Sequence, residues 1–142
     1  MARSDDRLDI IELIYRYAAI VDLGRYDDIP IVFADDAECD YSSMRAYLGD
    51  DTNPRGRVAI ERWIRRHTGT RSSMHFMHNP VVDLVDEHHA RMRNYMHNTN
   101  SSIAGIYEID ARRTPDGWRI ARLRLDERFL DADRVAPTPA TD

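Results

Sequence analysis

Apolar residues recur at steps of three and four over the first two dozen residues of the chain. This spacing places side chains on one face of a helix. The pattern predicts a helix over residues 6–23, with Ser4 or Asp5 as its N-cap and Gly24 just past its end. The members of the stripe are Leu8, Ile11, Tyr15, Ala18 and Asp22.

Asp22 is the ionisable member of this otherwise apolar stripe. A carboxylate taken out of water costs several kcal/mol unless it gains hydrogen bonds or a charged partner. Asp22 therefore either ends the helix in solvent or lines a polar pocket inside the core. Much of the functional interpretation depends on which of the two holds.

The rest of the chain predicts short helices followed by long strands. Residues 26–34 favour a short or irregular helix, because Pro30 lies inside it, and residues 43–55 stay open between a hairpin partner and a loop. Alternation at 37–42 indicates a strand. A third helix is expected over residues 57–67. Four further strands are expected over residues 73–85, 89–101, 103–112 and 118–129, the last two separated by the turn Thr114-Pro115-Asp116-Gly117.

This order of elements is typical of the α+β class, in which helices and antiparallel strands are segregated along the chain. We expect one domain over residues 1–130 and a disordered tail over residues 131–142, which is rich in Pro and small polar residues. A strongly curved, mostly antiparallel sheet wrapped around the N-terminal helices would form a cone-shaped α+β barrel. Such a cone can hold a ligand between the concave face of the sheet and the first helix.

Composition excludes several classes of function. The chain has 142 residues and a net charge of −5, which argues against a nucleic-acid surface. No apolar run approaches the roughly 20 residues that span a bilayer, and the polar N-terminus lacks a signal-peptide core, so a cytoplasmic location is expected. The single cysteine, Cys39, excludes an internal disulfide and is expected to be a small buried residue. All 20 basic residues are arginine, which removes Schiff-base lysine chemistry.

Four residues in apolar or core-forming segments could carry chemistry: Asp22, Tyr41, His75 and His97. A histidine can take and give a proton near neutral pH, and a neighbouring carboxylate would fix its tautomer. A tyrosine hydroxyl could hold a carbonyl and stabilise an enolate oxygen. Together these are the parts of an enolisation or elimination site, although each residue alone could equally be a hydrogen-bonded core residue.

Strand alternation bears on His97. It places His97 on the same face as Arg91, Arg93 and Tyr95, opposite Met92, Asn94 and Met96, unless a bulge switches the faces.

Alternation also bears on a competing metal site built from Asp22, His75, His78 and His97. His75 and His78 are three residues apart and would point to opposite faces of a strand, so we expect no metal site.

At these residues the chain resembles a known family. The segments that carry the resemblance are Tyr17-Ala18-Ala19-Ile20-Val21-Asp22 with Arg25-Tyr26-Asp27, Asp40-Tyr41-Ser42, Met74-His75-Phe76, and Met96-His97. In order and spacing, over about residues 7–130, they are similar to the SnoaL-like branch of the nuclear transport factor 2-like superfamily, and within it to the scytalone dehydratases.

The resemblance implies a cone-shaped barrel and elimination of water from a hydroxylated ring ketone without a cofactor. It implies that His75 is the base, that Tyr41 holds the carbonyl, and that Asp22 pairs with His97. It further implies an aromatic or polyketide-like ketone as substrate and a homo-oligomer, a dimer or trimer. The same fold also hosts isomerases, polyketide-type cyclases and non-catalytic binding modules, which remain alternatives.

Two departures from the family pattern bear on the substrate. Val21 stands where the family has a second tyrosine, and Gly105 and Tyr107 stand where it has a serine and an asparagine. Nearby polar side chains could compensate. The residues expected to contact the substrate are Tyr15, Val21, Trp63, Asn94, Asn98 and Tyr107.

Overall fold

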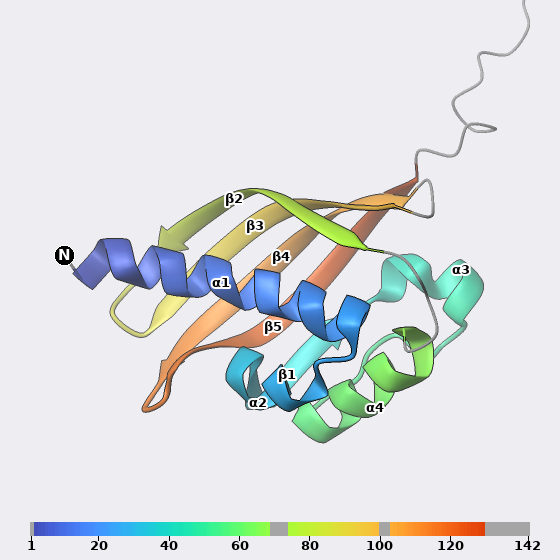
Figure 1. Cartoon of the computed structure of the whole chain (residues 1–142), viewed down its shortest axis with the longest axis horizontal. Coiled ribbons are helices and arrows are strands. Elements are labelled where there is room, and N and C mark those ends of the chain that lie inside the picture. The colour runs from blue at the N-terminus through green and yellow to red at the C-terminus, as the bar shows by residue number, and fades with distance from the viewer. Residues whose placement is uncertain (1, 69–73, 100–102, 130–142) are drawn as a thin grey trace, which may run out of the picture.

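The computed structural model describes residues 2–68, 74–99 and 103–129 (Figure 1). The tail predicted over residues 131–142 lies outside the described residues, as do the outer ends of the strands predicted at 73 and at 100–101. Within the described part of the chain, no helix is both long enough and apolar enough to cross a membrane. The helical elements are α1 (Ala2–Leu23), η1 (Tyr26–Asp28), α2 (Ile29–Val32), η2 (Ser42–Met44), α3 (Arg45–Leu48) and α4 (Arg57–Thr68).

Five strands form one open, mixed sheet in the order β1-β5-β4-β3-β2. The strands are β1 (Phe33–Asp40), β2 (His75–Leu84), β3 (His89–Asn98), β4 (Ile103–Thr114) and β5 (Gly117–Phe129). Strands β2 to β5 form an antiparallel meander, whereas β1 pairs with β5 in parallel. The sheet curves around α1, and α4 lies at one end of it (Figure 1). The fold is therefore the α+β cone that the sequence predicts.

Helix α1 buries a different face from the one predicted. Its buried residues include Ile10, Ile14 and Tyr17, whereas Leu8 and Tyr15 are 63% and 47% exposed. Apolar side chains lie nearly all around this helix, so more than one stripe satisfies the helical spacing. The predicted start of the helix at residue 6 is also wrong, because α1 already includes Ala2.

The predicted end of this helix is confirmed. Gly24 follows α1 at φ 68°, and its N–H donates to the Ile20 carbonyl at 3.1 Å. A left-handed residue of this kind stops a helix and redirects the chain. Asp22 thus lies in the last turn, and its side chain is only 6% exposed.

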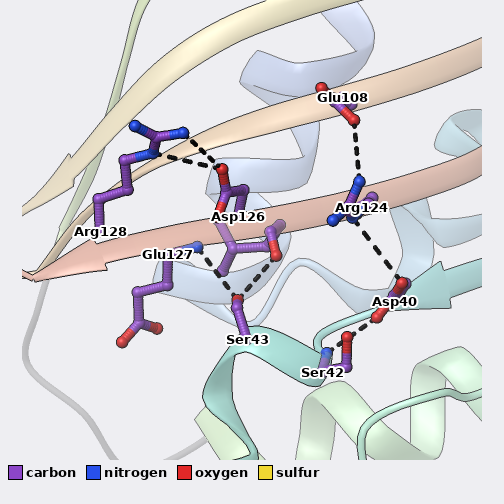
Figure 2. Close-up of polar contacts among 9 residues, drawn as sticks. Asp40, Ser42, Ser43, Glu108, Arg124, Asp126, Glu127 and Arg128 are labelled. Carbon is purple, nitrogen blue, oxygen red and sulfur yellow. Dashed lines mark hydrogen bonds and ion pairs between the residues drawn. The ribbon is translucent and has the colours of Figure 1, made fainter.

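Of the two alternatives left open for residues 43–55, the hairpin partner at residues 44–48 is wrong, because this segment is helical. After β1, Asp40 Oδ1 accepts the Ser42 N–H at 2.9 Å, an Asx turn that ends the strand and starts η2. Ser43 Oγ then donates to the Leu125 carbonyl at 2.7 Å and accepts the Glu127 N–H at 3.1 Å (Figure 2). These two bonds tie η2 and the adjoining α3 to β5, at one end of the concave face.

Side chains alternate strictly along β3. Ala90, Met92, Asn94 and Met96 are buried on the inner face, and the alternate positions from His89 to His97 are exposed. Strand β2 departs from regular pairing between His78 and Val81, where Asn79 adopts a φ of 51°. No bulge switches the faces of β3, so the inner face that the sequence assigns to this strand is confirmed.

Candidate functional site

A cavity of about 70 Å³ opens between the last turns of α1, helices α3 and α4, and the concave face of the sheet. Its apolar walls include Val21, Met44, Leu48 and Met96. Its polar walls are formed by three tyrosines, two histidines, Asn98, Thr68 and Glu127. Pockets that bind small molecules combine such an apolar lining with a few convergent polar groups.

His75 in the wall of this cavity forms a tight pair with Asp22, which is not itself part of the lining. Asp22 Oδ1 lies 2.5 Å from His75 Nδ1, and Asp22 Oδ2 accepts the His75 backbone N–H at 2.7 Å. The two side chains are 6% and 16% exposed. A carboxylate that accepts at both oxygens makes His75 Nδ1 a donor, which leaves Nε2 with the lone pair in the neutral imidazole.

The local structure explains why these two residues meet. Asp22 lies in the last turn of α1, and His75 is the first residue of β2, which packs against that helix. His75 faces inward, and its Nε2 lies 3.4 Å from Asn98 Nδ2 on the neighbouring strand. An amide donor beside Nε2 is compatible with a lone pair on that nitrogen. Asp22 is thus buried, and both of its oxygens accept from His75.

The predicted pairing of Asp22 with His97 is wrong. His97 lies on the outer face of the sheet, where its Nδ1 is 2.9 Å from His78 Nε2 and its ring stacks on Phe76. Strict alternation along β3 places it there. The four residues of the alternative metal site are therefore divided between two faces. Among the described residues, no three His, Cys, Asp or Glu side chains are grouped so that they could hold a metal ion.

Three buried tyrosines line the cavity near the Asp22–His75 pair. Tyr17 Oη and Tyr41 Oη are 2.7 Å apart, and the Tyr107 ring packs edge-on against Tyr17 at 5.7 Å. Burial is the main cause that raises the pKa of each of the three hydroxyls, and the Asp22 carboxylate adds to the rise for Tyr17. All three phenols therefore stay protonated. Because one hydroxyl of the Tyr17–Tyr41 pair donates to the other, only one of these two is left to donate to a ligand oxygen.

An alkaline titration should show that these three tyrosines are protected by burial. Tyr17, Tyr41 and Tyr107 should ionise only as the protein unfolds at high pH. Because folding raises the pKa of these three, their protonated form contributes stability below pH 10 that is lost as the pH rises further. Tyrosinate absorbance and circular dichroism, recorded together, should show a rise in tyrosinate absorbance that coincides with unfolding. Tyrosinate absorbance that reaches its final value before unfolding begins would contradict this assignment.

The structure divides the residues predicted to contact substrate into two groups. Val21, Trp63, Asn98 and Tyr107 line the cavity together with Tyr41. The other two do not. Tyr15 is exposed on the side of α1 that faces away from the cavity. Asn94 contacts Met77 instead, with its Nδ2 3.5 Å from the Met77 sulfur.

Sequence reasoning missed two ionisable residues of the cavity, His67 and Glu127. Glu127 is 8% exposed and follows Leu123 and Leu125 at steps of two on the inner face of β5. His67 lies four residues after Trp63 on α4, so both share one helix face. Each position could have been found by applying to these elements the periodicity that located the apolar core.

The arrangement of helices and sheet is shared with known proteins. Residues 2–124 match the model of the SnoaL-like domain. The chain belongs to the SnoaL-like family. An uncharacterised protein of Mycobacterium tuberculosis is 30% identical, and the alignment covers 86% of this chain and 85% of that protein.

Two solved structures share this SnoaL-like fold. A hexachlorocyclohexane dehydrochlorinase of Novosphingobium barchaimii aligns with a TM-score of 0.77 and 17% identity, over 98% of this chain and 94% of that one. A Novosphingobium aromaticivorans protein, provisionally named a scytalone dehydratase, aligns with a TM-score of 0.73 and 18% identity, over 91% and 89%. At such identities the likeness establishes the fold, and any function has to be argued from the site.

Proposed function

We propose that this protein is a lyase that removes water from a cyclic or aromatic hydroxy-ketone by acid–base chemistry of its own side chains. The observation that carries the proposal is the buried Asp22–His75 pair, which presents a basic nitrogen to an apolar cavity. A base held in one tautomer inside a desolvated pocket is suited to take a weakly acidic proton from carbon.

The first step is removal of the proton on the carbon next to the carbonyl. His75 Nε2 takes this proton, and the electron pair of the C–H bond passes to the carbonyl oxygen as an enolate. The imidazolium that forms is stabilised by the Asp22 carboxylate at 2.5 Å. A neutral hydroxyl of Tyr41 or a neighbouring tyrosine donates to the enolate oxygen.

The second step is loss of the leaving group. The electron pair returns from the enolate, a carbon–carbon double bond forms, and the bond to the β-hydroxyl breaks. With one proton taken by the leaving oxygen, the products are an unsaturated ketone and water. A ring that becomes aromatic on elimination would add driving force to this step.

The comparisons support this choice of reaction class. The two structural neighbours carry names of enzymes that remove hydrogen chloride or water. Both reactions break a C–H bond and expel a leaving group from the adjacent carbon. The cavity also suits an apolar ring, since Met44 and Met96 are flexible side chains that can move aside to enlarge its 70 Å³.

Asp22→Asn tests the proposal with two probes. 1-Tetralone reports proton removal through deuterium uptake in D₂O, and 3-hydroxy-1-tetralone reports elimination through formation of 1-naphthol. We expect the substitution to slow both reactions by about 10²–10³-fold. An asparagine offers one acceptor where His75 needs two, so it loses either the backbone bond or the Nδ1–H tautomer.

Asp83→Asn is the matched control, because Asp83 is exposed on β2. It should leave both rates unchanged. Wild-type rates in the folded Asp22→Asn variant, or no turnover of either probe by the wild type, would refute the proposal.

The second candidate is an isomerase or cyclase. The observation that favours it is that base and tyrosine hydroxyls alone suffice for moving a proton within a ketone. Product mass distinguishes the two, because a dehydratase product is lighter by one water and an isomerised product has the mass of its substrate.

A further inference from the structure

We propose that His67 is a second acid–base group of this cavity and delivers the proton that the departing hydroxyl takes up. The inference rests on the proposed elimination, to which it adds the missing proton donor. His67 lies at the end of α4 and lines the same cavity as His75. In the described part of the chain Asp22 hydrogen-bonds to His75 and not to His67, so the two histidines have separate partners.

His67 has a carboxylate partner of its own. Its Nε2 lies 2.9 Å from Asp51 Oδ2, while Arg66 Nη1 donates to the same oxygen, also at 2.9 Å. These contacts lower the pKa of Asp51, with the His67 bond the largest cause, so Asp51 is ionised at neutral pH. Because an ionised carboxylate only accepts, His67 Nε2 carries a proton, and Nδ1 is the nitrogen left to exchange a proton with a ligand.

The imidazole of His67 is part of the cavity wall, whereas Arg66 belongs to the surface. The side chain of His67 is 18% exposed and that of Arg66 is 60% exposed. The His67 ring packs on Trp63 at 4.7 Å, and Trp63 stacks on Tyr41 at 4.0 Å with the ring planes within 5°. Trp63 Nε1 also donates to the Asp51 carbonyl at 2.7 Å, which holds the carboxylate residue in place.

The cavity is thus lined by two histidines, and each is paired with an aspartate outside the lining. One pair bridges α1 and β2, and the other bridges α4 and the segment before it. A single histidine that has taken the carbon proton can pass it to the leaving oxygen only if that oxygen lies within reach of the same nitrogen. A second histidine removes this constraint. In this step His67 starts as the imidazolium, with Nε2–H bound to Asp51 and a second proton on Nδ1. His75 takes the carbon proton, His67 Nδ1–H gives its proton to the β-hydroxyl, and the C–O bond breaks to release water, which leaves His67 neutral and His75 protonated. Proton transfer from His75 to His67 through solvent then restores both groups.

The quality of the leaving group should reveal such a donor. 3-Hydroxy-1-tetralone expels hydroxide and needs a proton, 3-acetoxy-1-tetralone expels acetate and does not, and 1-tetralone only exchanges its proton. For His67→Gln we expect a loss of about 10²-fold in elimination of water. Acetate elimination and deuterium exchange should stay within about twofold of the wild type. The intact exchange reaction shows that the variant is folded and that its base works.

Two further variants sharpen the test. Asp51→Asn should reduce elimination of water less than His67→Gln does, and should shift its pH profile, because it changes the partner of His67 without removing the imidazole. Arg66→Gln removes the guanidinium charge that lies beside the Asp51 carboxylate. This variant should retain the wild-type preference between the two leaving groups. A His67→Gln variant that eliminates water at the wild-type rate, or that loses all three reactions equally, would overturn the inference. Failure of the proposed function is a separate result, since Asp22→Asn would then leave exchange and both eliminations intact.

Discussion

Replacing His75 by glutamine should lower the rate of elimination by about 10⁴-fold, the largest effect of any single substitution in the cavity. Glutamine is of similar size and can hydrogen-bond, but its amide does not take a proton at neutral pH. The backbone N–H of residue 75 keeps its bond to Asp22 Oδ2, so the fold should persist. The measurement is the initial rate of 1-naphthol formation from 3-hydroxy-1-tetralone, together with deuterium uptake by 1-tetralone.

His97→Gln is the informative control for this experiment. The same substitution is made one strand away, on the outer face, where His97 contacts His78 and Phe76. Its rates should match those of the wild type within about twofold. If His97→Gln lost activity and His75→Gln kept it, the base would be misassigned and the position of His97 in solution would differ from the one described.

Replacing Trp63 by alanine should destabilise the protein by about 3–5 kcal/mol. Trp63 is 5% exposed, and its ring fills the space between Tyr41 and His67. Alanine would leave a void there and remove the donor for the Asp51 carbonyl. Urea unfolding followed by circular dichroism measures the change as a lower midpoint with an unchanged slope.

Trp63→Phe separates the two contributions to this loss. Phenylalanine keeps most of the buried area and loses the hydrogen bond, so its cost should be closer to 1–2 kcal/mol, roughly the loss of one hydrogen bond with its acceptor left unpaired. Equal midpoints for Trp63→Ala and the wild type would show that this ring contributes little to stability.

Secondary structure and fold class followed from periodicity wherever one face of an element is buried. Strands β3 and β5 alternate between inner and outer positions, and their boundaries lie within a few residues of those predicted. Periodicity failed on α1, where apolar residues surround the helix. It also failed at residues 42–48, because the hydrogen bond from Ser42 to Asp40 and those of Ser43 to β5 decide that segment.

The candidate site was predictable in its residue types and less so in its pairing. The apolar stripe left Asp22 open between solvent and a buried pocket, and the resemblance favoured the pocket. The role of His75 as a base in that pocket followed from the same resemblance, which wrongly paired Asp22 with His97. The pairing of Asp22 with His75 joins residues 53 positions apart. Such contacts depend on how a helix end meets the edge of a curved sheet, which local periodicity does not encode. For His97, the alternation of β3 was the better guide.

The pair of hydrogen bonds between Asp22 and His75 has a consequence for folding as well as for chemistry. Strand β2 lies at the edge of the sheet, and its pairing with β3 is irregular after His78. An edge strand held on one side only is prone to slip, and a slip of one residue would turn His75 outward and bring a neighbour such as Phe76 inward. Because Asp22 accepts both the backbone N–H and the ring N–H of one residue, only one alignment satisfies both of its oxygens. The carboxylate therefore fixes the register of β2 against β3, and sequences that lose it should populate misaligned forms of β2.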